Sequence, residues 1–85
     1  MAIDGDNILV QYRAIIEHRV REQIERHQNV NPAADPRRAV EIQMQQERDK
    51  LERLIEKDET TPSQAEIFRL LIEWLPQLER KIKGR

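Results

Sequence analysis

Apolar residues recur along this 85-residue chain at spacings of three and four, the period of amphipathic α-helices, and the alternation typical of β-strands is absent. Short polar stretches containing Asn, Asp, Thr and Pro separate three such segments. The pattern predicts helices at about residues 7–28, 36–58 and 62–83. Because short connections between helices of similar length make them antiparallel neighbours, we expect an all-α antiparallel three-helix bundle.

Two of the predicted helix starts carry strong local signals. Asp35 precedes Pro36, which places a capping acid before a proline at the first helical position. Thr61 and Pro62 repeat this arrangement, and Gln64, three residues after Thr61, completes a capping box. These positions should therefore fix the starts of the second and third helices.

The ends of the chain carry weaker signals. Residues 4–7, DGDN, supply N-cap candidates for the first helix. A chain of this length supports one small domain, so we expect a single helical domain over residues 1–85 with flexible ends at 1–6 and 84–85.

The three apolar faces differ in width when residues are placed at about 100° steps around each helix axis. The second helix has a face of about 100°, which one neighbour can cover, whereas those of the first and third helices span roughly 180° and roughly 200°. The face of the first helix comprises Ile8, Leu9, Tyr12, Ile15, Ile16, Val20 and Ile24. That of the second comprises Val40, Met44, Leu51, Leu54 and Ile55. That of the third comprises Ile67, Phe68, Leu70, Leu71, Ile72, Trp74, Leu75, Leu78 and Ile82.

Three residues of the third face, Ile67, Leu70 and Trp74, lie at the margin of the core that two neighbouring helices would cover. If exposed together, they form the kind of contiguous apolar patch that marks a protein interface, and Trp is enriched among interface hot spots. The alternative is that the third helix lies between the other two and needs apolar residues on both sides. We expect homo-oligomerisation, as a dimer, through the third helix and part of the first, or binding of another helical protein.

Pro76 lies inside the predicted third helix, where it removes one backbone hydrogen bond and crowds Ile72. We therefore expect the helix to be kinked or broken near residues 72–76. A kink there either wraps the helix around its neighbours or shapes a binding groove.

Two charged residues interrupt the apolar faces. Arg19 lies within the face of the first helix, and Glu47 lies in the middle of the second, between Met44 and Leu51. In an antiparallel pair they would lie about 14 Å and about 17 Å from the connecting loop, so they could meet at one level. A buried charge needs such a partner. We interpret Arg19 and Glu47 as a structural polar pair that fixes helix register, with a ligand-binding or catalytic role as the alternative.

The segments ERDKLERLI and IFRLLIE, which begin at Glu47 and Ile67, resemble the second and third helices of the small all-helical chorismate mutases, which are dimeric enzymes. The resemblance implies that Glu47 matches an active-site acid and that Glu79 stands where the family often has Gln or Glu. Gln46 replaces an active-site Arg of the family, and two prolines within residues 29–36 interrupt its long first helix. A helical enzyme of this type is a further hypothesis.

Composition and charge narrow the possible functions. Charged residues make up 36% of the chain but nearly cancel, giving a formal net charge of −1, so no strong field would attract nucleic acid or an anionic membrane. The chain has no Cys, and the spacing of its His, Asp and Glu residues indicates no metal site. Because it lacks a basic and apolar leader and a run of roughly 18 apolar residues, we expect a cytoplasmic protein without a cofactor or membrane contact.

Basic residues gather at two places. Arg37 and Arg38 begin the second helix, the unfavourable end of its dipole, so we expect them to contact an acidic partner. A second basic cluster lies near the C-terminus, where the dipole favours cations, and comprises Arg80, Lys81, Lys83 and Arg85. We predict a non-enzymatic protein–protein interaction or assembly module. The alternative is a small dimeric regulator that binds nucleic acid through its basic C-terminus.

Overall fold

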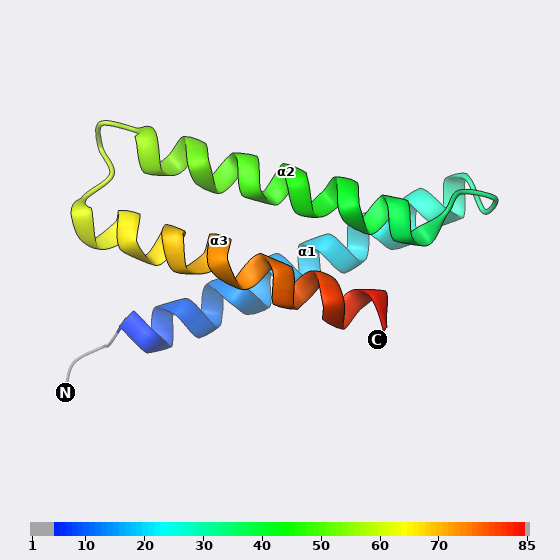
Figure 1. The fold of residues 1–85 in the computed structure, drawn as a ribbon, viewed down its shortest axis with the longest axis horizontal. Coiled ribbons are helices and arrows are strands. Elements are labelled where there is room, and N and C mark those ends of the chain that lie inside the picture. Colours follow the sequence, from blue (N-terminus) through cyan, green and yellow to red (C-terminus); the bar gives the residue numbers. More distant parts are fainter. Residues whose placement is uncertain (1–4, 85) are drawn as a thin grey trace.

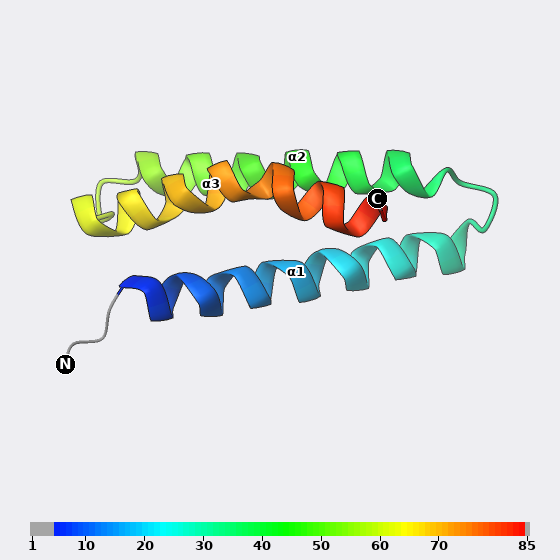
Figure 2. The ribbon, with the colours of Figure 1, turned by 60° about the horizontal axis from the view of Figure 1, so that its bottom comes forward.

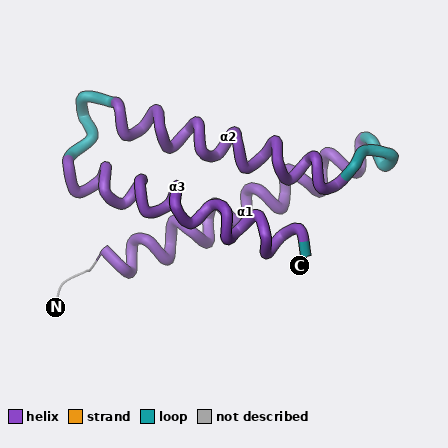
Figure 3. The backbone as a smooth tube through the Cα atoms, viewed as in Figure 1, coloured by secondary structure: helices purple, strands orange, loops and turns teal. Residues whose placement is uncertain are grey.

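The computed structural model describes residues 5–84, with side chains from residue 8 onward. These residues form three helices, α1 (Gly5–Val30), α2 (Pro36–Glu56) and α3 (Pro62–Lys83), and no strand. Figure 1 shows α1 and α3 running in one direction and α2 in the other, and Figure 3 shows the two connections between them. The predicted all-α antiparallel three-helix bundle is confirmed.

The two predicted caps form as expected. The Asp35 carboxylate accepts a hydrogen bond from the backbone N–H of Arg37 at the start of α2. At the start of α3, the Thr61 hydroxyl accepts from the backbone N–H of Gln64, and the Gln64 side chain accepts from the backbone N–H of Thr61. These local bonds satisfy donors that the first turn leaves free, which is why the sequence located both starts correctly.

The predicted limits of α1 and α2 need correction. α1 begins at Gly5 rather than residue 7, and it extends to Val30 rather than residue 28 because its last amides still find carbonyls four residues back. α2 ends at Glu56 rather than residue 58. The backbone N–H of Lys57 and the Thr60 hydroxyl both donate to the carbonyl of Leu54, so the following turn takes over the end of this helix.

The predicted flexible ends fall partly on residues 1–4 and 85, which lie outside the described residues. Within the described part, Gly5 and Asp6 belong to α1. Gly84 has φ of 85° and donates its N–H to the carbonyls of Arg80 and Lys81, closing α3. This left-handed conformation carries a steric penalty for residues with a Cβ, so glycine is the favoured residue there.

Pro76 does not break α3, which continues unbroken to Lys83. Figure 2 shows the helix bowed along its length. Leu71, Leu75 and Leu78, on either side of the proline, are all buried, and their packing holds the helix together across the missing hydrogen bond. Of the two predicted outcomes, a kink or a break, the break is therefore wrong.

The core lies along the line where the three helices meet, and α2 and α3 form its most extensive contact. Its buried members are Ile16, Val20, Val40, Met44, Leu51, Leu71, Leu75 and Leu78. Only the first two come from α1, which Figure 2 shows on one side of the α2–α3 pair. None of the described helices has a stretch long and apolar enough to cross a membrane.

Candidate interaction surface

Arg19 and Glu47 meet between α1 and α2. Arg19 Nε lies 3.0 Å from one carboxylate oxygen of Glu47, and Arg19 Nη2 lies 2.7 Å from the other. The Glu47 side chain is only 2% exposed, whereas that of Arg19 is 43% exposed and reaches the surface. The two-point contact fixes α1 and α2 at one level, because sliding either helix would break both bonds.

The electrostatics of this pair favour the charged form of Arg19. The hydrogen bonds to Glu47 raise the pKa of the Arg19 guanidinium above its ordinary value, outweighing the opposing effect of partial burial. Lys50 Nζ lies 3.9 Å from Glu47 and adds a second positive charge. Arg19 engages both oxygens of Glu47, and we call this two-point contact the clamp.

The other two positions named by the chorismate mutase resemblance, Gln46 and Glu79, are not part of the Arg19–Glu47 contact. Gln46 is exposed on α2. Glu79 lies on α3, where its carboxylate forms an ion pair of 2.8 Å with Lys83. Among residues 5–84, no three His, Asp or Glu side chains are grouped in a way that would hold a metal ion.

The predicted partner-binding residues on α3 are divided between core and surface. Trp74 is half-buried, and the guanidinium carbon of Arg13 lies 5.5 Å from its ring centroid, so α1 covers it. Ile67 is also half-buried and packs against the core. Leu70 is 41% exposed. Because α3 has neighbours on two sides, much of its wide apolar face is covered by α1 and α2.

Exposed apolar side chains gather instead on α1. Ile8, Tyr12 and Ile15 are 37%, 39% and 54% exposed, and they recur at the spacing of one helical side. This side continues through Arg19 to the other end of α1. We name its members the α1 row: Ile8, Tyr12, Ile15, Arg19, Gln23, Arg26 and Val30. Val30 is 85% exposed, so the row is apolar at both ends.

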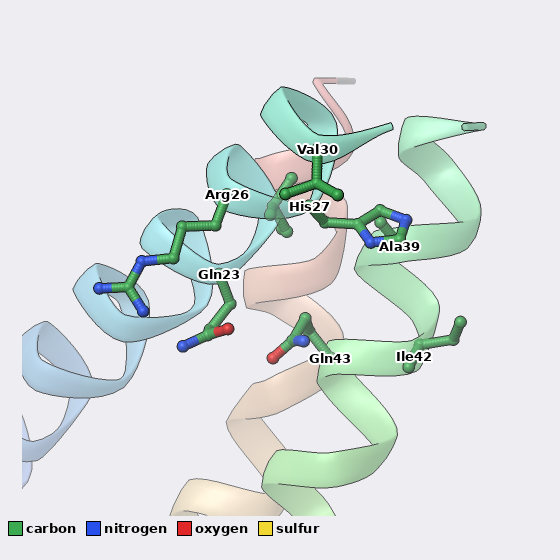
Figure 4. Close-up of a pocket in the computed structure, with 8 residues that line it drawn as sticks. Gln23, Arg26, His27, Val30, Ala39, Ile42 and Gln43 are labelled. Carbon is green, nitrogen blue, oxygen red and sulfur yellow. The ribbon is translucent and has the colours of Figure 1, made fainter. Parts of the chain in front are cut away.

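A groove of about 320 Å³ lies between the C-terminal half of α1 and the N-terminal half of α2. We call it the α1–α2 groove; its lining includes Gln23, His27 and Val30 of α1 and Ala39, Ile42 and Gln43 of α2. Figure 4 shows Gln23 and Gln43 pointing toward each other between the helices. Ile42 is 46% exposed and gives the groove an apolar edge on the side of α2.

Signals for this surface were present in the sequence. Ile8, Tyr12 and Ile15 belong to the wide face predicted for the first helix, and its surplus width corresponds to the exposed part of the α1 row. Ile42 lies off the predicted apolar face of the second helix, and an apolar residue outside the core face is a signal of exposure. No role for Ile42 or Val30 was predicted from the sequence.

The C-terminal lysines mainly tie the bundle together. Lys83 Nζ lies 2.8 Å from Glu79 and 3.1 Å from Glu41 of α2, and these hydrogen bonds raise the pKa of Lys83. Lys81 Nζ lies 3.2 Å from Glu17 of α1. These carboxylates therefore neutralise part of the predicted basic cluster.

Arg37 and Arg38 are both exposed at the start of α2. One guanidinium nitrogen of Arg38 lies 4.0 Å from the carboxylate of Glu41, at the outer limit of an ion pair. Neither arginine lies in the lining of the α1–α2 groove.

Comparison of the chain with protein-family models, with curated proteins and with solved structures finds no match.

Proposed function

We propose that this chain is a cytoplasmic, non-enzymatic protein–protein interaction module that self-associates through the α1 row and the adjoining α1–α2 groove. The observation that carries the proposal is the alignment of Ile8, Tyr12 and Ile15 as exposed apolar side chains along one side of α1. Aligned apolar exposure of this kind is a feature of interaction sites, whereas isolated exposed apolar residues are ordinary.

The clamp between Arg19 and Glu47 supports a binding role over a catalytic one. A general base needs an oxygen within reach of a substrate proton, and the Glu47 side chain, held at both oxygens by Arg19, is only 2% exposed. The clamp also holds α1 against α2 in the middle of the α1 row, which keeps the proposed surface in a defined shape before binding.

The test is the solution mass of the wild type and three variants, measured by light scattering over a concentration series. Ile15→Glu places a charge in the α1 row and should give a folded monomer. Val10→Glu is the matched control, since Val10 is 60% exposed but lies on the opposite side of α1. Leu70→Glu tests the α3 margin and should leave association unchanged.

Two outcomes would contradict the proposal. A wild type that remains monomeric at every concentration removes self-association. Dissociation by Leu70→Glu, with none by Ile15→Glu, moves the binding surface to α3. Circular dichroism of each variant checks that the helices remain folded.

A further inference from the structure

We propose that two copies of this chain pair their α1 helices antiparallel, about a two-fold axis close to Arg19, so that the apolar end of each α1 row lies over the α1–α2 groove of the other copy. This inference rests on the proposed function and deepens it by naming the partner and its register.

The spacing of the α1 row is symmetric about Arg19. Tyr12 precedes Arg19 by seven residues and Arg26 follows it by seven, while Ile8 and Val30 each lie eleven residues away. At 1.5 Å per residue, these offsets are about 10 Å and about 16 Å along the axis. A two-fold axis at Arg19 therefore superposes the levels of the row in one copy on those in the other, as a self-complementary interface requires.

The side chains brought to one level are chemically suited to each other. Ile8 of one copy meets the level of Val30 of the other, so two exposed apolar groups cover each other. Tyr12 meets the level of Arg26, which permits contact between a guanidinium and an aromatic ring. Within the described part of the chain, the Arg26 side chain forms no hydrogen bond or ion pair.

The α1–α2 groove accepts the remaining apolar residue. In this register Ile15 of one copy falls at the level of Gln23 of the other, and Gln23 lines the groove together with Ile42. Contact between Ile15 and Ile42 would remove apolar surface from water at two places in the dimer.

The charges near the axis are compatible with this pairing. The two Arg19 side chains approach each other, but each already carries its own Glu47 counter-charge at 2.7 Å. Glu22, one turn beyond His18, comes within one turn of Arg19 and His18 of the other copy. The acidic and basic groups are thus complementary across the axis.

Disulfide trapping tests the register directly, because the chain has no cysteine of its own. Ile8→Cys and Val30→Cys are made as two separate proteins and then mixed under mild oxidation. An antiparallel pair should give a covalent dimer in the mixture and little in either protein alone. The two sites lie about 33 Å apart along α1 within one copy, so the bond must join two chains.

Val10→Cys mixed with Val30→Cys is the matched control, and this mixture should not cross-link. Cross-linking of each variant with itself, with no bond between the two different variants in the mixture, would indicate parallel helices and overturn the proposal. If the wild type self-associates but none of these variants cross-links, this arrangement is wrong while the proposed function stands. A monomeric wild type would overturn both.

A second measurement examines the predicted Tyr12–Arg26 contact. Arg26→Gln removes this contact at both of its places in the symmetric dimer and should weaken dimerisation about five- to thirtyfold, the range expected for loss of two exposed cation–π contacts. Arg80→Gln, an equivalent change near the end of α3, should leave the dissociation constant unchanged. Equal effects of the two changes would indicate general electrostatics and would contradict the contact.

Discussion

The α2–α3 pair and α1 differ in how much of their apolar faces they bury. α2 has a narrow apolar face that its neighbours cover, and α3 has a wide face with neighbours on two sides. α1 also has a wide face but buries only Ile16 and Val20 in the core. The width of an apolar face therefore predicts burial only when it is compared with the number of helices available to cover that face. On α1, the part of the apolar face that α2 and α3 do not cover is exposed to solvent.

The largest expected difference is in the stability lost when a buried side chain of α3 or an exposed side chain of α1 is truncated. Leu71→Ala removes a side chain that is 1% exposed, and it should lower the free energy of unfolding by about 3 kcal/mol through lost transfer energy and a residual cavity. Ile15→Ala, at a position that is 54% exposed, should change it by less than about 1 kcal/mol. Urea titration at a concentration where the protein is monomeric measures both. Similar losses would mean that α1 packs as tightly as α3.

Replacing either partner of the Arg19–Glu47 clamp, which joins α1 to α2, should lower the free energy of unfolding by different amounts. Arg19→Met leaves the buried Glu47 carboxylate with only Lys50 nearby and should cost about 2 kcal/mol, less than for a fully buried pair because Arg19 is 43% exposed. Glu47→Leu should cost less, since the freed guanidinium can turn to solvent. Chemical denaturation of both variants and of the double variant measures the difference. A greater loss for Glu47→Leu would contradict this account.

Substitution of Trp74 should affect the stability of the fold but not self-association. Since Trp74 packs between α3 and Arg13 of α1, Trp74→Ala should lower the free energy of unfolding by about 2 kcal/mol, below the loss for a fully buried Trp. The dissociation constant of the folded dimer should remain close to that of the wild type. Paired denaturation and light scattering would show this. Weakened association with unchanged stability would restore Trp74 as an interface residue.

The smallest expected effect is a pH dependence at the contact between α1 and α3. Partial burial raises the pKa of Glu17, but hydrogen bonds from Arg21 and Lys81 outweigh it, so the pKa lies below its ordinary value of 4.5. The stabilisation is thus present above pH 4.5 and lost as the pH falls through the lower folded-state pKa. Comparing unfolding of the wild type and Glu17→Gln at about pH 6 and about pH 3 should show a gap of a few tenths of a kcal/mol that closes in acid. A gap that widens in acid would contradict the sign.

Local and periodic features of this fold were accessible from the sequence. Asp35 and Thr61 cap helices through bonds to residues two or three positions away, so no tertiary information was needed. Arg19 and Glu47 were placed at one level by helical rise and a short loop alone. Their two-point geometry required the structure, because a wheel gives level and direction but no contact.

The identity of the exposed face was not accessible in the same way. A helical wheel shows that α1 and α3 both have wide apolar faces, but it does not show which helix receives neighbours on two sides. That choice depends on how α1 crosses the α2–α3 pair. It places Trp74 beneath Arg13 and leaves Ile15 exposed. The end of α2 was also missed, because the Thr60 hydroxyl that closes it comes from the following turn.

We propose that the surplus apolar surface of α1 forms the self-association surface. The most direct test is the set of backbone amide NMR shifts recorded over a dilution series of the wild-type protein. We predict concentration-dependent changes along the α1 row and around Ile42 of α2, with none around Leu70 and Glu73 on the outer side of α3. Changes centred on Leu70, or no change at any residue, would contradict the claim.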